Sequence, residues 1–440
     1  MGGLKLKDLK LRNKFQALFM RVFKVEILIG DIIPDQIQKV IDISNTIDYS
    51  LDLSSLDLNL ENLLEIYQII QEYGLSVKFV NEIIKLNNLK LLQLICSQKS
   101  IYPDQEGVNT AAGNGYLDIL KWMSSEIKLY PNQDDVNWAS SNGKLDVLRW
   151  MVSIKNMYPD QEGVNLASQN GYLDVLKWIA SEIKSYPDQE GVNFTALYGK
   201  LDVLKWVAFE IKLYPDQGGV NWAARDGHLD IIQWMVDEKN IHPDQIGANM
   251  AAEYGKLDMV EYIAFVRNIY PDQNGINLAS ASGKLDVLKW VASKIGLYPD
   301  QKGINFAISY GKLDVLRWII SIRDIYPDQN AVNLAASNGY LDVLQCVAII
   351  TNFYPNQRGV NLCSQDGKLN VLQWVASEIG LYPDQQGINA AASNGYLDVL
   401  QWVASEIELY PDQKGINSAS RRGKLNVLQW VASEIGLYPN

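Results

Sequence analysis

The side chains that could support covalent or metal chemistry are few and scattered. The chain has two histidines, His228 and His242, and three cysteines, Cys96, Cys346 and Cys363. A catalytic nucleophile needs a histidine beside it, and a zinc site needs several ligands drawn mainly from these two residue types. Neither the number nor the spacing suits either kind of site. We therefore expect no enzyme, no metal site and no cofactor.

A recurring carboxylate is the other candidate for chemistry. It follows a leucine in Asp118, Asp146, Asp174 and later copies. A repeating unit places equivalent residues in a row automatically, and an aspartate in the first turn of a helix is favoured by the helix dipole. We interpret this row as structural. The repeat itself, which accounts for most of the chain, positions this row of aspartates.

A tyrosine–proline pair marks the repeat. It recurs in steps of 28 residues from Tyr102 to Tyr438, with His242 replacing the tyrosine once, and it defines twelve complete units from 102 to 437. Self-similarity at such a period is typical of solenoids. One elongated array is therefore expected, in place of the roughly three domains that chain length alone would suggest.

Each unit contains two predicted helices. In the first copy, a short helix runs from about Asn109 to Asn114, and Gly115 ends it because glycine readily adopts the left-handed conformation. A second helix runs from about Leu117 to Lys128, with apolar residues at three- and four-residue spacing. Proline stops continuation, and Tyr-Pro-Asp-Gln is expected to form a compact loop. The unit predicts almost pure α-helix with negligible strand.

Two polar positions never vary among the units, namely Gln105 and Asn109 with their equivalents. An amide side chain carries both donors and an acceptor, and an asparagine before a helix can cap it. We interpret the two rows as ladders that satisfy loop backbone groups between units.

The unit resembles the ankyrin repeat. Residues 108–112 (Val-Asn-Thr-Ala-Ala) and 115–120 (Gly-Tyr-Leu-Asp-Ile-Leu) match the family's Leu-His-x-Ala-Ala and Gly-His-Leu-Glu-Val-Val at the same internal spacing. The unit has 28 residues, whereas the family has about 33, so the family's β-hairpin is expected to be missing. Short arrays of this kind are similar to proteins of very large DNA viruses of amoebae. The resemblance implies an all-α, ankyrin-like solenoid of twelve helix–turn–helix units.

The regions that flank the array carry separate predictions. Residues 1–73 are not repeat, and residues 74–101 are interpreted as a degenerate capping repeat before the array at 102–440. The basic start of the chain fits either an amphipathic membrane or partner segment or a solvated helix. Residues 33–41 resemble the opening of an F-box, which would recruit substrates to a host ubiquitin ligase. The array stops in mid-unit, so end-to-end association through an uncapped C-terminus is also expected.

Charge and cysteine content suggest which partners and compartment to expect. The net charge is −12 with a pI near 4.8, which argues against nucleic acid because phosphate binding needs clustered lysine and arginine. No apolar run reaches the roughly 18 residues of a membrane span. Sparse cysteines suit a reducing compartment, so we expect an intracellular location, such as a host cytoplasm, and no secretion.

Positions that diverge between units predict the binding surface. In ankyrin-like stacks, the two residues after Ala-Ala line the concave groove, and in the central units they are rich in tyrosine and charge, as at interface hot spots. The predicted partner-binding residues are Tyr198, Arg225, Asp226, Glu253, Tyr254 and Tyr310. The tyrosines could instead fill gaps between short helices. A second diverging position drifts along the array from acidic, as in Glu106, to basic, as in Lys302.

The function predicted from these features is a non-enzymatic scaffold that binds a protein along the concave face of the array. Two alternatives stay open at this point. One is an F-box-like adaptor of a ubiquitin ligase, and the other is a structural repeat protein without a defined partner.

Overall fold

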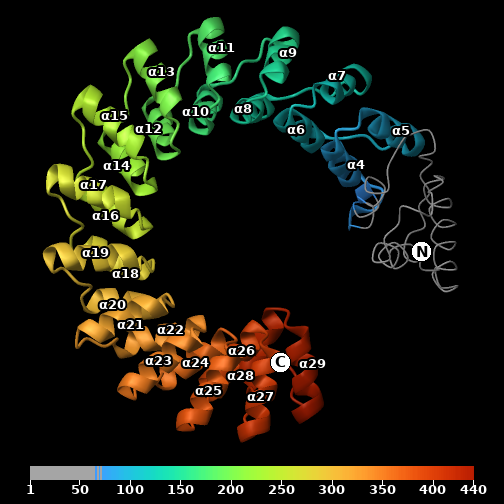
Figure 1. The fold of residues 1–440 in the computed structure, drawn as a ribbon. Coiled ribbons are helices and arrows are strands. Elements are labelled where there is room, and N and C mark those ends of the chain that lie inside the picture. The colour runs from blue at the N-terminus through green and yellow to red at the C-terminus, as the bar shows by residue number, and fades with distance from the viewer. Residues whose placement is uncertain (1–64, 67–68, 70–71) are drawn as a thin grey trace, which may run out of the picture. The chain divides into compact units, whose positions relative to one another are not determined.

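The computed structural model describes residues 65–66, 69 and 72–440 (Figure 1). The regular structure of these residues is helical, with no strand. The prediction of an all-α solenoid that lacks the ankyrin hairpin strands is thereby confirmed for this part of the chain. The basic N-terminal segment and the F-box-like residues 33–41 lie outside the described residues.

The described chain divides into two compact units. The N-terminal unit comprises the described residues up to Thr195 together with Asp202–Tyr214, and the C-terminal unit comprises Ala196–Leu201 and Pro215–Asn440. The N-terminal unit contains α4 (Val77–Ile83), the 3₁₀ helix η2 (Ile84–Leu86), α5 (Leu89–Lys99), α6 (Gln105–Asn114), α7 (Leu117–Glu126), α8 (Gln133–Ser141), α9 (Leu145–Lys155), α10 (Gln161–Asn170), α11 (Leu173–Ile183) and most of α12 (Gln189–Leu197) and α13 (Leu201–Ile211).

The C-terminal unit continues the same alternation of a first and a second helix. It contains α14 (Gln217–Asp226), α15 (Leu229–Lys239), α16 (Gln245–Tyr254), α17 (Leu257–Arg267), α18 (Gln273–Ala281), α19 (Leu285–Ile295), α20 (Gln301–Ser309), α21 (Leu313–Ile322), α22 (Gln329–Asn338), α23 (Leu341–Thr351), α24 (Gln357–Gln365), α25 (Leu369–Ile379), α26 (Gln385–Asn394), α27 (Leu397–Ile407), α28 (Gln413–Arg421) and α29 (Leu425–Ile435).

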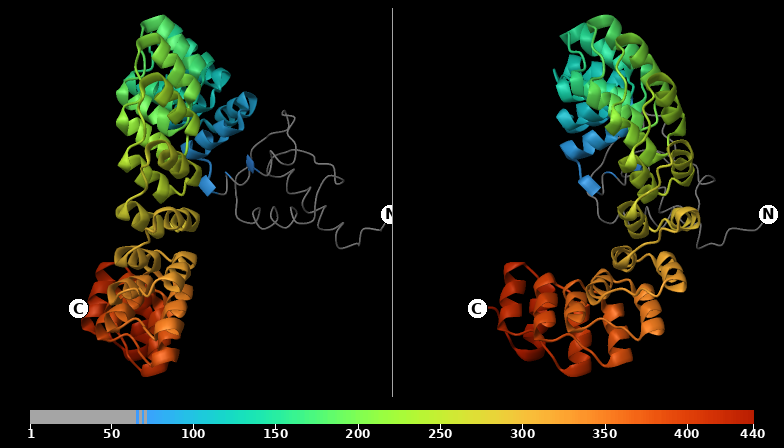
Figure 2. Two further views of the ribbon diagram at one scale, coloured as in Figure 1. Left: turned by 60° about the vertical axis from the view of Figure 1, so that its left-hand side comes forward. Right: turned by 90° about the vertical axis from the view of Figure 1, so that its left-hand side faces the viewer.

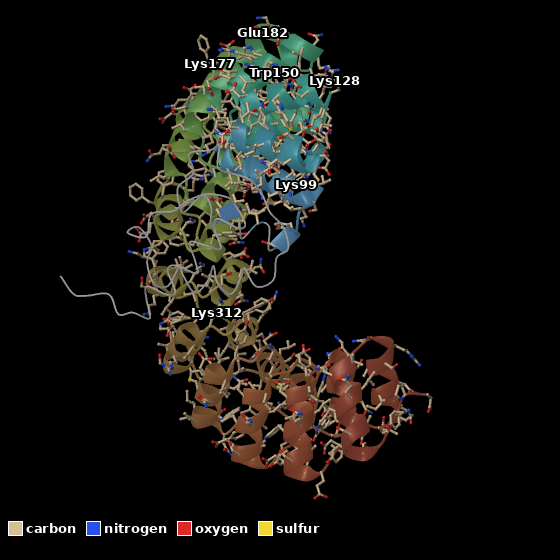
Figure 3. All side chains as sticks on the ribbon, turned by 90° about the vertical axis from the view of Figure 1, so that its right-hand side faces the viewer. Lys99, Lys128, Trp150, Lys177, Glu182 and Lys312 are labelled. Carbon is tan, nitrogen blue, oxygen red and sulfur yellow. The ribbon has the colours of Figure 1, made fainter. Side chains whose placement is uncertain are left out.

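Each unit is a stack of two helix layers. The even-numbered helices α6 to α28, here called the inner helices, lie along the inner side of each unit (Figure 1). The odd-numbered helices α7 to α29, here called the outer helices, form the second layer, which Figure 2 shows from two further sides. Figure 3 adds the side chains, including Trp150 on α9 and Lys177 and Glu182 on α11. The core lies between the layers and between successive repeats, where apolar side chains such as Val220, Ile232 and Met235 are fully buried.

The inner helices begin four residues earlier than predicted. Helix α6 starts at Gln105, not near Asn109, because the Asp104 side chain accepts a hydrogen bond from the Glu106 backbone N–H (3.0 Å) and caps the helix. Such a cap satisfies otherwise free N–H groups and offsets the low helix propensity of Gly107. Asn109 therefore lies inside the helix and does not cap it. The expected Tyr-Pro-Asp-Gln loop is therefore shorter than predicted, since Asp104 caps α6 and Gln105 is its first residue.

The glycine that ends each inner helix is left-handed, as predicted. In the twelve repeats its φ lies between +65° and +91°. The structure adds a second reason for glycine, because a side chain from the next repeat lies across it. An added Cβ would be 2.3 Å from Cδ1 of Tyr172 at Gly143 and 2.7 Å from Cδ of Lys284 at Gly255. Contacts this short require the neighbouring side chain to move.

The invariant amides form ladders between repeats, which confirms that prediction. In the C-terminal unit, Asn221 donates to Asp244 Oδ1 (2.9 Å) and its Oδ1 accepts from the Asp244 backbone N–H (3.2 Å). Gln217 Nε2 donates to Asn221 Oδ1 (3.2 Å) and to the backbone oxygen of His242 (2.9 Å). Each pair of amides thus holds the loop and the helix cap of the following repeat.

The helix pair before the array makes the same contact. Asn81, on α4, donates to Asp104 Oδ1 (2.7 Å) and accepts from the Asp104 backbone N–H (3.3 Å). The loop tyrosines add a further contact within many repeats, as where Tyr158 stacks on Trp178 with ring centroids 6.0 Å apart. The amide ladder and the aromatic stack are therefore properties of the repeat framework.

One repeat departs from the ladder because Asp135 stands at the position of Gly107. Its carboxylate is fully buried and accepts hydrogen bonds from the Asn132 backbone N–H (2.7 Å) and from Gln105 Nε2 (2.6 Å). Burial nevertheless raises the pKa of Asp135 to about 6. The deviation places a titratable group inside the framework of the N-terminal unit.

Candidate partner-binding surface

The exposed side of each inner helix presents three positions that lie four residues apart. In the first repeat they are residues 106, 110 and 114, and on α20 they are Lys302, Phe306 and Tyr310. Residues at this spacing share one side of a helix. These three positions, in all repeats, are here called the inner face.

Four of the predicted partner-binding residues form one cluster in the C-terminal unit. Arg225 Nε donates to Asp226 Oδ1 (2.9 Å), and the Arg225 guanidinium carbon lies 4.7 Å from the ring centroid of Tyr254. The hydrogen bond to Asp226 raises the pKa of Arg225 above its ordinary value, and Tyr254 and Tyr198 add smaller effects in the same direction. Tyr198 and Tyr254 are 48% and 44% exposed. Each of these tyrosines is therefore partly covered by neighbouring side chains and partly open to solvent.

The remaining two predicted residues lie apart from this cluster or at its edge. Glu253 is half-buried, one position before Tyr254 on α16. Tyr310 lies two inner helices further along, and at the equivalent two positions the intervening α18 has only the short side chains of Ala281 and Ser282. The stripe that the sequence predicts is thus interrupted at α18. Tyr310 instead packs edge-on against Phe306, with ring centroids 6.2 Å apart.

A groove between α20 and α22 is the second feature of this surface. It encloses about 330 Å³ and is lined mainly by apolar atoms. Phe306 and Tyr310 line it from the side of α20, and Ala331 and Leu334 line it from the side of α22. Tyr310 and Leu334 are 54% and 50% exposed. The amine of Lys302 lies 5.4 Å from the Phe306 ring centroid, so a cation stands beside the groove.

The middle position of the inner face is a row of apolar side chains that sequence analysis missed. In the N-terminal unit its members are Thr110, Trp138, Leu166 and Phe194. In the C-terminal unit they are Trp222, Met250, Leu278, Phe306, Leu334, Leu362, Ala390 and Ser418. All are half-buried or exposed. Alignment of the repeats reveals this row, because the position is apolar in repeat after repeat although it follows the invariant asparagine on the solvent side.

The first position of the inner face changes charge along the chain. In the N-terminal unit it is acidic in all four repeats, as Glu106, Asp134, Glu162 and Glu190. In the C-terminal unit it is Gly218, Ile246, Asn274, Lys302, Asn330, Arg358, Gln386 and Lys414. Every one of these residues is exposed. The two units therefore offer different electrostatic surfaces to a partner.

The residues first considered for chemistry are used in packing. Burial raises the pKa of the Cys96 and Cys363 thiols to about 12, which disfavours the reactive thiolate. His228 Nε2 lies 2.9 Å from the backbone oxygen of Leu197. Among the described residues, no group of three or more His, Cys, Asp or Glu side chains could hold a metal ion. Over the same part of the chain, no helix has the length and apolarity of a membrane span.

Comparisons with known proteins place the fold in a broad class. Neither a protein-family model nor a curated protein matches the chain. Among solved structures, the chain is similar to the pentatricopeptide repeat protein PPR10 in complex with an 18-nucleotide psaJ RNA element, with a TM-score of 0.33 and 15% identity over 86% of this chain and 68% of that chain. It is also similar to PPR10 from maize, with a TM-score of 0.29 and 14% identity over 92% and 72% of the two chains. Such distant likeness concerns the helical-repeat fold alone.

The prediction that excluded nucleic acid as a partner is wrong. Helical repeat structures similar to this chain include one bound to RNA. The net charge of −12 describes the whole chain, whereas association depends on the local charge of one surface. The inner face from α20 to α28 carries Lys302, Arg358 and Lys414 and is not acidic. Nucleic acid is therefore included among the ligands to be tested. Stacked helix pairs that repeat every 28 residues, without strand among the described residues, identify the fold of this chain as an α-helical repeat array.

Proposed function

We propose that this chain is a non-enzymatic scaffold that binds a protein partner on the inner face of its C-terminal unit. The observation that carries the proposal is the cluster of Tyr198, Arg225, Asp226 and Tyr254, in which a guanidinium is held between a carboxylate and an aromatic ring at the surface. Arginine and tyrosine are the residue types most enriched at interface hot spots.

The geometry of the cluster favours binding over a purely structural role. Nearly half of each tyrosine residue is exposed, so it retains surface to bury against a partner. Arg225 is held in place by Asp226 and Tyr254 before any partner arrives, which lowers the side-chain entropy lost on association. The apolar row beside the cluster extends the surface along the stack.

The finer identity of the scaffold is also part of this proposal. The ankyrin family is proposed on the repeat motif, with the 28-residue unit accounting for the lack of the family's hairpin strands in the described residues, and a viral source is proposed on the short unit. An intracellular location agrees with three cysteines that are buried free thiols. The alternative of an F-box-like adaptor depends on residues outside the described part of the chain, so no structural observation favours it.

Proximity labelling in cells tests the proposal with two matched variants of the full chain. One is the double variant Tyr198→Ser and Tyr254→Ser, and the other is Phe209→Ser and Phe265→Ser. The two phenylalanines are 74% and 91% exposed on the outer helices, so the control removes exposed aromatic area from the other layer. We expect the first variant alone to lose specific labelling of a partner, with an unchanged melting temperature.

The opposite results would assign different roles to the tyrosines. If both variants label the same proteins as the parent, the inner-face cluster is not a binding site. If the tyrosine variant melts at a lower temperature and labels the same proteins, the rings belong to the framework.

A further inference from the structure

We infer that the groove between α20 and α22 receives a large apolar side chain from an acidic segment of a protein partner. This inference rests on the proposed scaffold function and deepens it by naming the partner's chemistry. It concerns Phe306, Tyr310 and Leu334, which line the groove, and the cations that lie on the same face.

The shape and lining of the groove suit a side chain of a peptide. Its volume of about 330 Å³ lies at the low end of the range for small-molecule sites, about 300–1,000 Å³. The edge-on contact of Phe306 with Tyr310 already orients one wall, so little ordering is required when an anchor residue enters. Tyr310 and Leu334 each leave about half of their surface uncovered, and this apolar area is what the anchor would bury.

The charges around the groove select an acidic segment. From α18 to α28, the inner helices and their C-terminal caps carry five cations, namely Lys302, Arg358, Lys414, Arg421 and Arg422, and one carboxylate, Asp366. The N-terminal caps of these helices add the carboxylates of Asp272, Asp300, Asp328, Asp384 and Asp412, each of which accepts hydrogen bonds from the backbone N–H groups of its own helix. Lys302 stands over Phe306, so a carboxylate next to the anchor residue would come within reach of its amine. Opposite charge around an apolar anchor increases the association rate and discriminates against basic partners.

The carboxylates nearest the groove are already engaged. Asp328, in the groove wall, accepts hydrogen bonds from Asn305 Nδ2 (2.8 Å) and from the Ala331 backbone N–H (2.9 Å). Asp300 caps α20 through the N–H groups of Lys302 and Gly303. Asp366 accepts a hydrogen bond from the Ser337 hydroxyl. Each therefore has a structural role, whereas the amine of Lys302 extends into solvent over the Phe306 ring.

The spacing of the cations favours an acidic peptide over a nucleic acid strand. Lys302, Arg358 and Lys414 occur on every second inner helix, which corresponds to about 16–20 Å at ordinary helix spacing. A nucleic acid carries a phosphate on every nucleotide and is bound by a closely spaced basic track with aromatic stacking platforms. The neighbouring members of the apolar row, Leu278, Leu334 and Leu362, are aliphatic and offer no ring for a base.

Selection from a phage-displayed library of random twelve-residue peptides tests the inference without assuming a sequence. The bait is the full chain, and the enriched peptides are then synthesised with fluorescein and titrated by anisotropy. We expect enriched sequences to contain one aromatic or large aliphatic residue flanked by aspartate or glutamate. A fluorescent pool of random 20-nucleotide single-stranded RNA is titrated in parallel.

Three variants locate the bound peptide. The first is Lys302→Glu with Arg358→Glu, and the second is Leu334→Ser. The control is Lys289→Glu with Arg317→Glu, which makes the same charge change at exposed positions of the outer helices α19 and α21. We expect the first two variants to raise the peptide Kd about tenfold or more and the control to leave it unchanged. Melting curves of all variants should overlay that of the parent, since the changed side chains are exposed.

The results that would overturn the inference are specific. Enrichment of basic or neutral peptides, absence of enrichment, or equal binding by all variants would each reject an acidic occupant of the groove. If the RNA pool displaces the peptide and binds more tightly than it, the inner face that carries Lys302, Arg358 and Lys414 would be assigned to nucleic acid. Loss of partner labelling in the Tyr198 and Tyr254 variant, together with a failed peptide selection, would leave the scaffold function in place and reject only the groove.

Discussion

The inner faces of the two units differ in charge although the repeats beneath them are the same. In the N-terminal unit, the first inner-face position is a carboxylate in every repeat, and the last position is Asn114, Asn142 or Asn170 in the first three. In the C-terminal unit, the first position is neutral or basic, and the last includes Tyr254 and Tyr310. The caps, ladders and left-handed glycines occur in both units. The side chains that differ between the two units are therefore ones that the framework does not use.

The hydrogen bonds of the ladder explain why this separation is possible. In Asn137 and in Asn221, the amide oxygen and nitrogen are both committed to the loop of the next repeat. Exposed residues such as Glu162 and Lys302 contribute only their backbone N–H to the helix cap. Their side chains can change without loss of a hydrogen bond of the cap.

The largest effect is expected where glycine is replaced in the framework of either unit. Gly143→Ala and Gly367→Ala each place a methyl group at positive φ and within 2.4 Å of a tyrosine ring atom from the next repeat. Strain and overpacking should together lower the free energy of unfolding by about 3 kcal/mol in both cases. Gly296→Ala is the control, because its φ is also positive (+64°) but nothing lies within 4 Å. Denaturant unfolding should show a smaller loss for the control, and unequal losses in the two units would contradict a shared framework.

Removal of a ladder amide should have the next largest effect. Asn137→Ala and Asn221→Ala each delete the acceptor of the Asp160 or Asp244 backbone N–H and the donor to that carboxylate. A buried group without a partner costs about 1–3 kcal/mol, so we expect a loss near 2 kcal/mol in each unit. Hydrogen exchange should report faster exchange at the first turn of the next inner helix. Unchanged protection there would show that water replaces the amide.

A pH-dependent effect is expected at Asp135, which stands in the N-terminal unit where most repeats have glycine. The folded pKa of Asp135 is about 6, above its unfolded value of 3.8. Below pH 3.8 the carboxyl is protonated in both the folded and the unfolded state, and the fold tolerates it. As the pH rises through 6, the buried carboxyl must ionise, and the free energy of unfolding decreases. Asp135→Gly restores the residue found in most repeats. Its free energy of unfolding, relative to that of the parent, should increase by on the order of 1–2 kcal/mol from pH 4 to pH 7. Thermal melts at both pH values measure the difference, and a constant difference would mean that Asp135 does not titrate there.

The smallest effect is expected from exchange of the charges that distinguish the two units. Glu162→Lys and Lys302→Glu change exposed side chains in the first turn of an inner helix. The helix dipole favours the acid, so the first substitution should destabilise and the second should stabilise by a few tenths of a kcal/mol. Equilibrium unfolding at low and high salt checks this, since screening should remove both effects. Losses above about 1 kcal/mol would place these residues in the framework.

The sequence by itself determined the repeat, the two-helix unit, the left-handed glycines and the amide ladders. The reason is periodicity, because identical units at a fixed spacing have identical surroundings and must satisfy the same groups each time. The sequence also indicated the candidate binding residues, because their positions vary from repeat to repeat whereas those of Gln105 and Asn109 do not. Exposed apolar residues beside them, such as Leu334, were missed. Whether an apolar side chain is buried or exposed depends on how the next repeat packs against it.

Only the tertiary structure decided how these residues meet. The start of α6 at Gln105 depends on the conformation of Asp104, which also accepts a hydrogen bond from the amide of Asn81 on α4. The stacking of Arg225 on Tyr254 and the groove between α20 and α22 each join side chains about one repeat apart in the sequence. Such contacts depend on how closely successive helices pack and on which side chains are large at each step. A periodic pattern does not contain that information, because it describes what the repeats share, whereas these contacts arise from what each repeat does differently.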